Sequence, residues 1–209
     1  MSMLSRLFGS SDDERARRII NRAEREAAET LQPLGNLAIA IAKASQDCAG
    51  QMKPMLDVPD GKEKKEAEVL VFYEFVYFFM HMTMRSASVQ MTEQQIQKLQ
   101  GYLGPLISST AVDSFFAHWP EDMKKKIRDE FFDKLNDAEM EYSACKELLS
   151  EKNPLTGDSL FSKLARNVVE LCGNSMNPAV LTLVISAGAD AYKGLQLDTL
   201  VKNASKALR

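Results

Sequence analysis

The sequence predicts an all-α protein: a single bundle of about seven to nine helices packed around one central apolar helix over about residues 63–88. Apolar residues recur at intervals of three and four along most of the chain, which is the helical period. Helix-capping residues, prolines and glycines separate these stretches. No segment shows the alternation typical of a strand, and no repeat of fixed period is found.

The first predicted helix covers residues 12–31. It opens with acidic residues, which favour a helix N-terminus, and one face carries an apolar stripe: Ala16, Ile19, Ile20, Ala23, Ala27 and Leu31. Pro33 suits the first turn of a second helix, which we expect to end near Gly50. Met3, Leu4, Leu7 and Phe8 stand beside a single arginine, which leaves a short membrane-touching or partner-docking peptide as an alternative. Because this stretch lacks the charge and length of a stable anchor, we expect residues 1–11 to form a flexible N-terminal segment, followed by one helical domain over residues 12–209.

The central helix follows a loop, KPMLDVPDGK, that contains two prolines and an Asp-Gly pair. Sixteen residues lie between Glu68 and Arg85, interrupted by Glu74 and His81. A membrane-spanning helix needs about 20 mostly apolar residues, and a carboxylate near its middle opposes insertion. We therefore expect the core helix of a bundle and no integral membrane association.

The next two helices begin with clear signals. Thr92 and Gln95 have the spacing of a capping box, and Gly104 with Pro105 should kink or end the helix that follows. A further helix should begin at Pro120.

On the helix that begins at Pro120, apolar residues form a single stripe that continues to about Ser150. At about 1.5 Å per residue this helix would be about 45 Å long. A compact domain of this size has a radius of gyration of roughly 17 Å. We therefore expect a second subunit to cover part of this stripe.

Three shorter helices complete the chain. We expect them over about Ser159–Cys172, from Pro178 to near Gly194 with Asn177 as the cap, and from about Asp198 onward.

Composition argues against several partners. Of 209 residues 26% are charged, and the net charge of −3 gives no basic field to attract nucleic acid. The three cysteines lie far apart with no metal-binding spacing, which favours buried, reduced thiols. The N-terminus has no long apolar run typical of a signal peptide. We expect a cytoplasmic protein.

The one place where the sequence suggests chemistry is the central helix. Glu74, His81 and Arg85 fall at i, i+7 and i+11, in one narrow sector with Tyr77. Together they suggest a binding site in which the imidazole exchanges a proton and the guanidinium holds an acidic ligand. The favoured alternative is a stripe of paired polar groups that fixes helix packing.

Glu74 and His81 are separated by about 10 Å of helix rise, too far for direct contact. We therefore expect a neighbouring helix to complete the Glu74 network. His81 and Arg85, about one turn apart, are expected to share a second acceptor.

No known catalytic or metal-binding pattern is recognised. Helical di-iron proteins carry Glu-x-x-His motifs, whereas Phe78 and Phe115 stand three residues before His81 and His118. Phosphate loops, dinucleotide fingerprints and nucleophile elbows are not found in the sequence either. We expect no catalytic residues, metal or cofactor. The favoured function is non-enzymatic binding of another protein or of a second copy. The alternative is a small-molecule or metal-binding protein, or an enzyme, built around Glu74, His81 and Arg85.

Overall fold

The computed structural model describes residues 31–116, 120–150, 155, 157–174 and 177–209. Within these ranges the protein is all-α, as predicted, with seven α-helices, one short 3-10 helix and no strand. The elements are a helix over residues 31–52, η1 (Lys53–Met55), α2 (Lys62–Gln90), α3 (Glu93–Phe116), α4 (Glu121–Ser143), α5 (Leu160–Leu171), α6 (Pro178–Leu195) and α7 (Leu197–Ala207). The helix predicted over residues 12–31 lies outside the described residues, apart from Leu31, which is helical.

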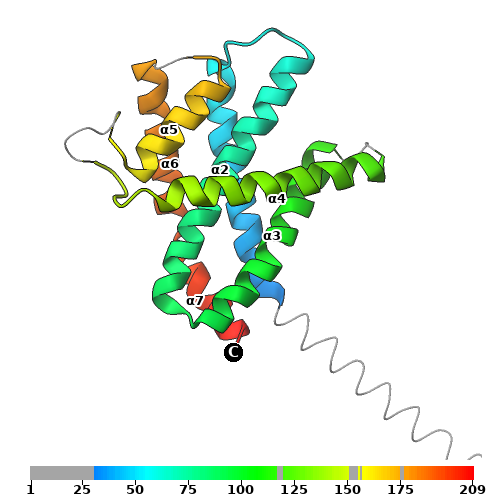
Figure 1. Ribbon diagram of the computed structural model, residues 1–209, viewed down its shortest axis with the longest axis vertical. Helices are drawn as coiled ribbons and strands as arrows, with labels where there is room; N and C mark the ends of the chain where they lie inside the picture. Colours follow the sequence, from blue (N-terminus) through cyan, green and yellow to red (C-terminus); the bar gives the residue numbers. More distant parts are fainter. Residues whose placement is uncertain (1–30, 117–119, 151–154, 156, 175–176) are drawn as a thin grey trace, which may run out of the picture.

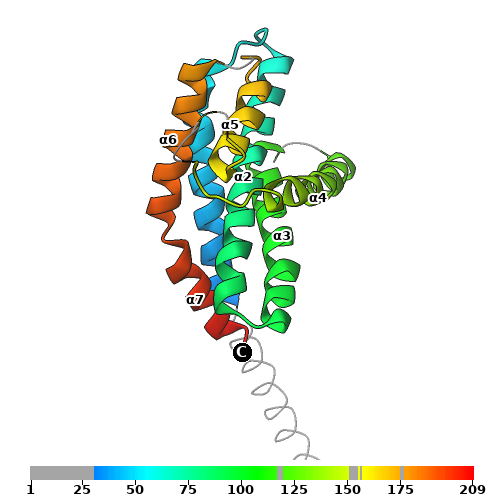
Figure 2. The same ribbon diagram turned by 60° about the vertical axis from the view of Figure 1, so that its left-hand side comes forward.

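The centre of the bundle is α2, as the sequence predicts. Every residue of 71–83 is buried except Glu74, which is partly buried. Helix α2 contacts α3, α4, α5 and α7. The helix over residues 31–52 and α6 lie side by side, and α4 crosses α2 (Figures 1 and 2).

By length and composition α2 is the one described helix that could cross a membrane. However, 72% of its most apolar window is buried against the rest of the protein. This burial is what the core helix of a bundle shows.

The start of α3 follows the predicted capping box. Gln95 accepts the backbone N–H of Thr92 at 3.0 Å, and the Thr92 hydroxyl accepts that of Gln95 at 3.4 Å. The helix does not end near Gly104: it continues through Pro105 to Phe116. Pro105 is exposed and loses only its own intrahelical bond, whereas the buried stripe continues on the opposite face, over Leu99, Leu103 and Ile107.

Helix α4 is shorter than predicted. It has 23 residues, or about 34 Å, and ends at Ser143 rather than near Ser150. The carbonyl oxygens of Glu147 and Leu148 accept the backbone N–H groups of Leu160 and Phe161 at 2.9 and 3.1 Å. The segment after α4 therefore pairs with the first turn of α5 instead of remaining helical. The expectation of a second subunit over this stripe loses its premise.

The last three helices start close to the predicted positions. The side chain of Ser159 accepts the N–H of Ser162 at the start of α5, and that of Asn177 accepts the N–H of Ala179 at the start of α6. Gly188 allows α6 to approach α5, since a Cβ there would lie 3.1 Å from the Leu164 side chain. All three cysteines are buried and unpaired.

At one end of the bundle, the loop that follows α5 contacts the loop that precedes α2. Gly173, with φ of +72°, passes so close to Asp57 that a Cβ would lie 2.6 Å from its carbonyl oxygen. The N–H of Asp57 donates to the carbonyl of Cys172 at 2.8 Å. Glycine is required at position 173 both by its backbone conformation and by this approach.

Candidate functional site

Glu74 joins three helices through one oxygen atom. Its Oε1 accepts a hydrogen bond from the Tyr142 hydroxyl of α4 at 2.6 Å and one from the Asn167 amide of α5 at 2.8 Å. The expectation that neighbouring helices complete the Glu74 network is confirmed. Burial raises the pKa of Glu74, and these two hydrogen bonds partly oppose the shift.

His81 is bound to a different residue of α4. Its ring is 3% exposed, and Nδ1 lies 3.0 Å from a carboxylate oxygen of Glu139. Because a carboxylate accepts, Nδ1 is the donor in this pair. Nε2 is buried and has no hydrogen-bond partner among the described atoms.

Arg85 and Tyr77 lie in other surroundings. Arg85 is exposed and donates to the carbonyl oxygen of Cys145 at 3.2 Å, so the expected sharing of an acceptor with His81 is wrong. One turn beyond His81, the guanidinium has passed the end of α4 and reaches the chain that follows it. The Tyr77 ring packs 5.3 Å from that of Phe131, and its hydroxyl is buried without a partner in the described part of the chain.

The four predicted site residues share a face of α2 but do not converge on one point. Each side chain meets its own partner or none. Three histidine, cysteine or acidic side chains that could together hold a metal ion are not found within the described ranges. The contacts of Glu74 and His81 hold α4 and α5 against α2; a ligand-binding role for the four residues stays a prediction.

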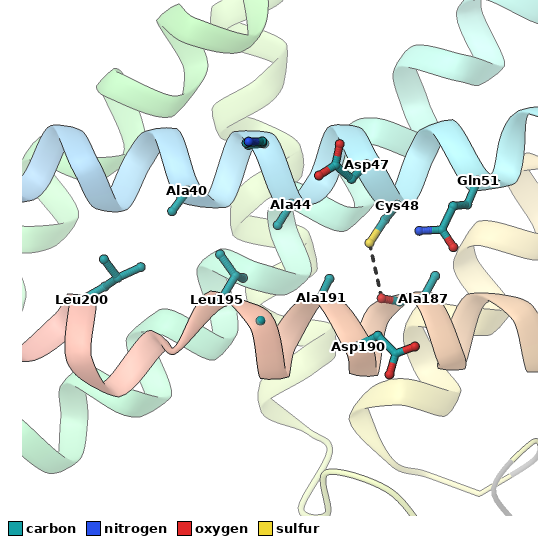
Figure 3. A pocket seen from close by; sticks show the side chains of 12 residues that line it. Ala40, Ala44, Asp47, Cys48, Gln51, Ala187, Asp190, Ala191, Leu195 and Leu200 are labelled. Carbon is teal, nitrogen blue, oxygen red and sulfur yellow. Dashed lines mark hydrogen bonds between the residues drawn. The ribbon is translucent and has the colours of Figure 1, made fainter.

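A second candidate site is a surface groove between the helix over residues 31–52 and α6. Its volume is about 500 Å³. Figure 3 shows the two helices running antiparallel, with Ala44 across from Ala191 and Cys48 across from Ala187. The lining residues are Ala40, Lys43, Ala44, Asp47, Cys48, Gln51, Ala187, Asp190, Ala191, Gly194, Leu195 and Leu200.

The floor of the groove is made of small and apolar side chains. Ala40, Ala44 and Cys48 repeat every four residues, so they share one face of their helix. The Cys48 thiol lies 3.5 Å from the carbonyl oxygen of Ala187, which fixes how closely the two helices approach. Burial, and secondarily the charge of Asp47, raises the pKa of this thiol to about 12, so it stays a neutral part of the floor.

The rim of the groove is charged. Lys43 and Asp47 are exposed on one side and Asp190 on the other. None of these three side chains forms an ion pair or hydrogen bond with another residue that the structure describes.

Sequence reasoning missed both the partners of Glu74 and the groove. Tyr142 and Asn167 lie 68 and 93 residues from Glu74, and nothing local indicates that they meet it. For the groove a weak signal existed: alanines spaced by four at 40 and 44 and again at 187 and 191. None of Glu74, Tyr77, His81 and Arg85 lines the groove.

Comparison of the chain with protein-family models, curated proteins and solved structures finds no match. Geometry and charge are therefore the guides to what either site binds.

Proposed function

We propose that the protein is a non-enzymatic, cytoplasmic binding protein whose groove between the helix over residues 31–52 and α6 receives an amphipathic helix from a protein partner. Recognition of this kind lays the apolar face of a helix into an apolar groove. The observation that carries the proposal is the groove itself, with its apolar floor and charged rim.

The dimensions of the groove suit a short helix. From Ala40 to Gln51 the helix rises about 17 Å, which equals about three turns of a helix lying alongside. Small floor residues let a partner backbone approach closely, because interhelical distance depends on the side chains at the contact. The charges of Lys43, Asp47 and Asp190, which have no ion-pair partner among the described residues, supply orientation and selectivity at the rim.

A photoreactive phenylalanine analogue placed at Gln51 tests this proposal in cells. Gln51 lies on the groove, whereas Gln46 is exposed on the same helix outside the lining and provides the matched control. We expect cross-links from position 51 to map, by mass spectrometry, to one segment with an amphipathic helical pattern, and position 46 to give little product. Absence of product at 51, or equal products at both positions, contradicts the proposal.

A second candidate function is small-molecule or metal binding around Glu74, Tyr77, His81 and Arg85. The observation that favours it is that His81 Nε2 and the Tyr77 hydroxyl are buried without hydrogen-bond partners among the described residues. Elemental analysis and native mass spectrometry of the full-length protein test it. A bound species that is lost on His81→Ala, with the unfolding midpoint kept, supports this function; large destabilisation with no bound species supports the structural interpretation.

A further inference from the structure

We propose that the dipeptide of Asp60 and Gly61 is a site of spontaneous covalent modification, at which aspartate converts to isoaspartate, and that Lys64 controls the rate of this conversion. The dipeptide lies in the loop between η1 and α2, directly before the first residue of α2. Three observations support the proposal: an exposed carboxyl group, a backbone nitrogen beside it that is free to react, and an ion pair that keeps the carboxyl group ionised.

Both reacting groups are accessible. The Asp60 side chain is 91% exposed, and the backbone N–H of Gly61 has no hydrogen-bond partner in the described part of the chain. Apart from its chain neighbours, nothing lies within 4 Å of the position that a Cβ of Gly61 would take. Glycine itself has no Cβ to hinder attack by its nitrogen. The sequence contains no other Asp-Gly pair and no Asn-Gly pair.

The modification is a condensation followed by a hydrolysis. The Gly61 nitrogen attacks Cγ of the protonated Asp60 carboxyl group; an N–Cγ bond forms, the nitrogen loses its proton and Cγ loses hydroxide, so one water molecule leaves and a cyclic imide remains. Water then opens the ring. Cleavage of the bond to Cγ restores aspartate, whereas cleavage of the bond to the main-chain carbonyl carbon leaves Gly61 joined through the side chain as isoaspartate. Water is the only other reactant, and no group is oxidised or reduced.

Lys64 opposes the first of these steps. Its ammonium group donates to Oδ1 of Asp60 at 2.9 Å. This hydrogen bond, and secondarily the charge of Lys64, lowers the pKa of the Asp60 carboxyl. An ionised carboxylate resists attack because its oxygen atoms are poor leaving groups, so the ion pair reduces the reactive fraction at neutral pH. The two residues are one helical turn apart, so they pair only while the start of α2 is folded.

The loop can accommodate the modified bond without unfolding. Isoaspartate adds one carbon atom to the main chain between Asp60 and Gly61. On one side the N–H of Asp57 is held by the carbonyl of Cys172 at 2.8 Å, and on the other the carbonyl of Gly61 accepts the N–H of Lys65 at 3.3 Å. The added atom lies between these two contacts, in an exposed stretch of the loop. We therefore expect modified molecules to stay folded.

Ageing of the full-length protein at neutral pH tests the proposal. Peptide mapping with electron-transfer fragmentation distinguishes isoaspartate from aspartate, which have the same mass. We expect more isoaspartate at position 60 than at any other aspartate, and roughly two- to fivefold faster accumulation in Lys64→Gln. Lys65→Gln is the matched control and should age at the wild-type rate, because it removes an exposed charge from the same turn that has no ion pair with Asp60.

The same measurement in urea separates the ion pair from an effect of sequence. Unfolding removes the pairing of Lys64 with Asp60, so wild type and Lys64→Gln should then form isoaspartate at equal rates.

Each other outcome overturns the inference. Isoaspartate no more frequent at position 60 than at other aspartates excludes the site. Equal rates in folded wild type and Lys64→Gln, or an equal increase in Lys65→Gln, exclude control by Lys64. A difference between wild type and Lys64→Gln that persists in urea shows that the sequence, and not the ion pair of the folded protein, sets the rate.

Discussion

A single carboxylate oxygen, Glu74 Oε1, links α2, α4 and α5. The Tyr142 and Asn167 donors come from different helices, so the position of each helix depends on the same acceptor. The Tyr142 ring is fully buried and packs 5.6 Å from that of Phe78. Polar contacts of this kind fix the relative placement of helices as well as contributing to stability.

Tyr142→Phe should lower the free energy of unfolding by about 1–3 kcal/mol, because it removes one of two donors to a buried carboxyl group. Tyr77→Phe is the matched control. It removes a buried hydroxyl that has no partner among the described atoms, so stability should be unchanged or slightly higher. Urea denaturation of both variants measures the difference. If both variants lost the same free energy of unfolding, the hydrogen bond from Tyr142 to Glu74 would contribute nothing specific to stability.

The stability contributed by Glu74 should depend on pH in a defined direction. Burial raises the pKa of this group above its ordinary value of 4.5, so the folded state binds the proton more tightly than the unfolded chain. That contribution is complete below pH 4.5 and is lost as the pH rises through the raised folded value. The advantage of wild type over Glu74→Gln should therefore shrink from acidic to neutral pH.

Chemical denaturation of both proteins over this pH range measures the difference in the free energy of unfolding. Glu66→Gln, at an exposed position of the same helix, is the control and should show a nearly constant difference. An advantage of wild type that grows with pH would contradict the burial argument.

Among the elements, the boundary between α6 and α7 is the least ordinary. Gln196 both ends α6 and precedes α7, with φ and ψ of 47° in the left-handed region. It is the one described residue other than glycine with positive φ. Glycine is the usual residue at such a position because a Cβ makes the conformation unfavourable.

Gln196→Gly should raise the free energy of unfolding by about 0.5–1 kcal/mol, the relief of left-handed strain exceeding the added freedom of the unfolded chain. The same substitution at Gln97, exposed within α3, should lower it by about 0.5–1 kcal/mol. Thermal and denaturant unfolding compare the two. If both substitutions lowered the free energy of unfolding, Gln196 would have to make contacts that compensate for its left-handed conformation.

Residues 69–84 of α2 should exchange their amide hydrogens more slowly than any other segment. This helix is covered on most of its surface, and such segments open only when the whole protein unfolds. Hydrogen exchange followed by mass spectrometry compares the exchange rates of the segments. Faster exchange in α2 than in α6 would show that the bundle opens around its centre first.

Local patterns predicted the described helices and most of their starts, and failed where distant groups decide. The capping box at Thr92, the cap at Asn177 and the apolar run of α2 are all encoded within a few residues. The end of α4 is not encoded in this way. Leu149 extends the apolar stripe of this helix in the sequence, yet it is 44% exposed because its segment pairs with α5. For the same reason Glu74 was identifiable as unusual, whereas its partners were not.

At the scale of the whole molecule, α2 connects the elements by touching α3, α4, α5 and α7. Helix α6 packs against α5, which in turn packs against α2. We expect one cooperative unfolding transition, which is the behaviour that the predicted single domain over residues 12–209 requires. Far-ultraviolet circular dichroism and the fluorescence of the single tryptophan, Trp119, should give coincident curves. Two separated transitions would divide the chain into two domains.

The dependence of α2 on the C-terminal helix also affects synthesis of the protein. Ser86, near the end of α2, hydrogen-bonds to Asp198 of α7, which lies 112 residues later. At roughly 5–20 residues per second, a ribosome needs on the order of 6–20 s to produce the chain between them. During that interval the central helix of the bundle has left the ribosome without its C-terminal cover. The nascent chain therefore exposes apolar surface that the finished protein conceals, and we expect chaperones to bind it during synthesis.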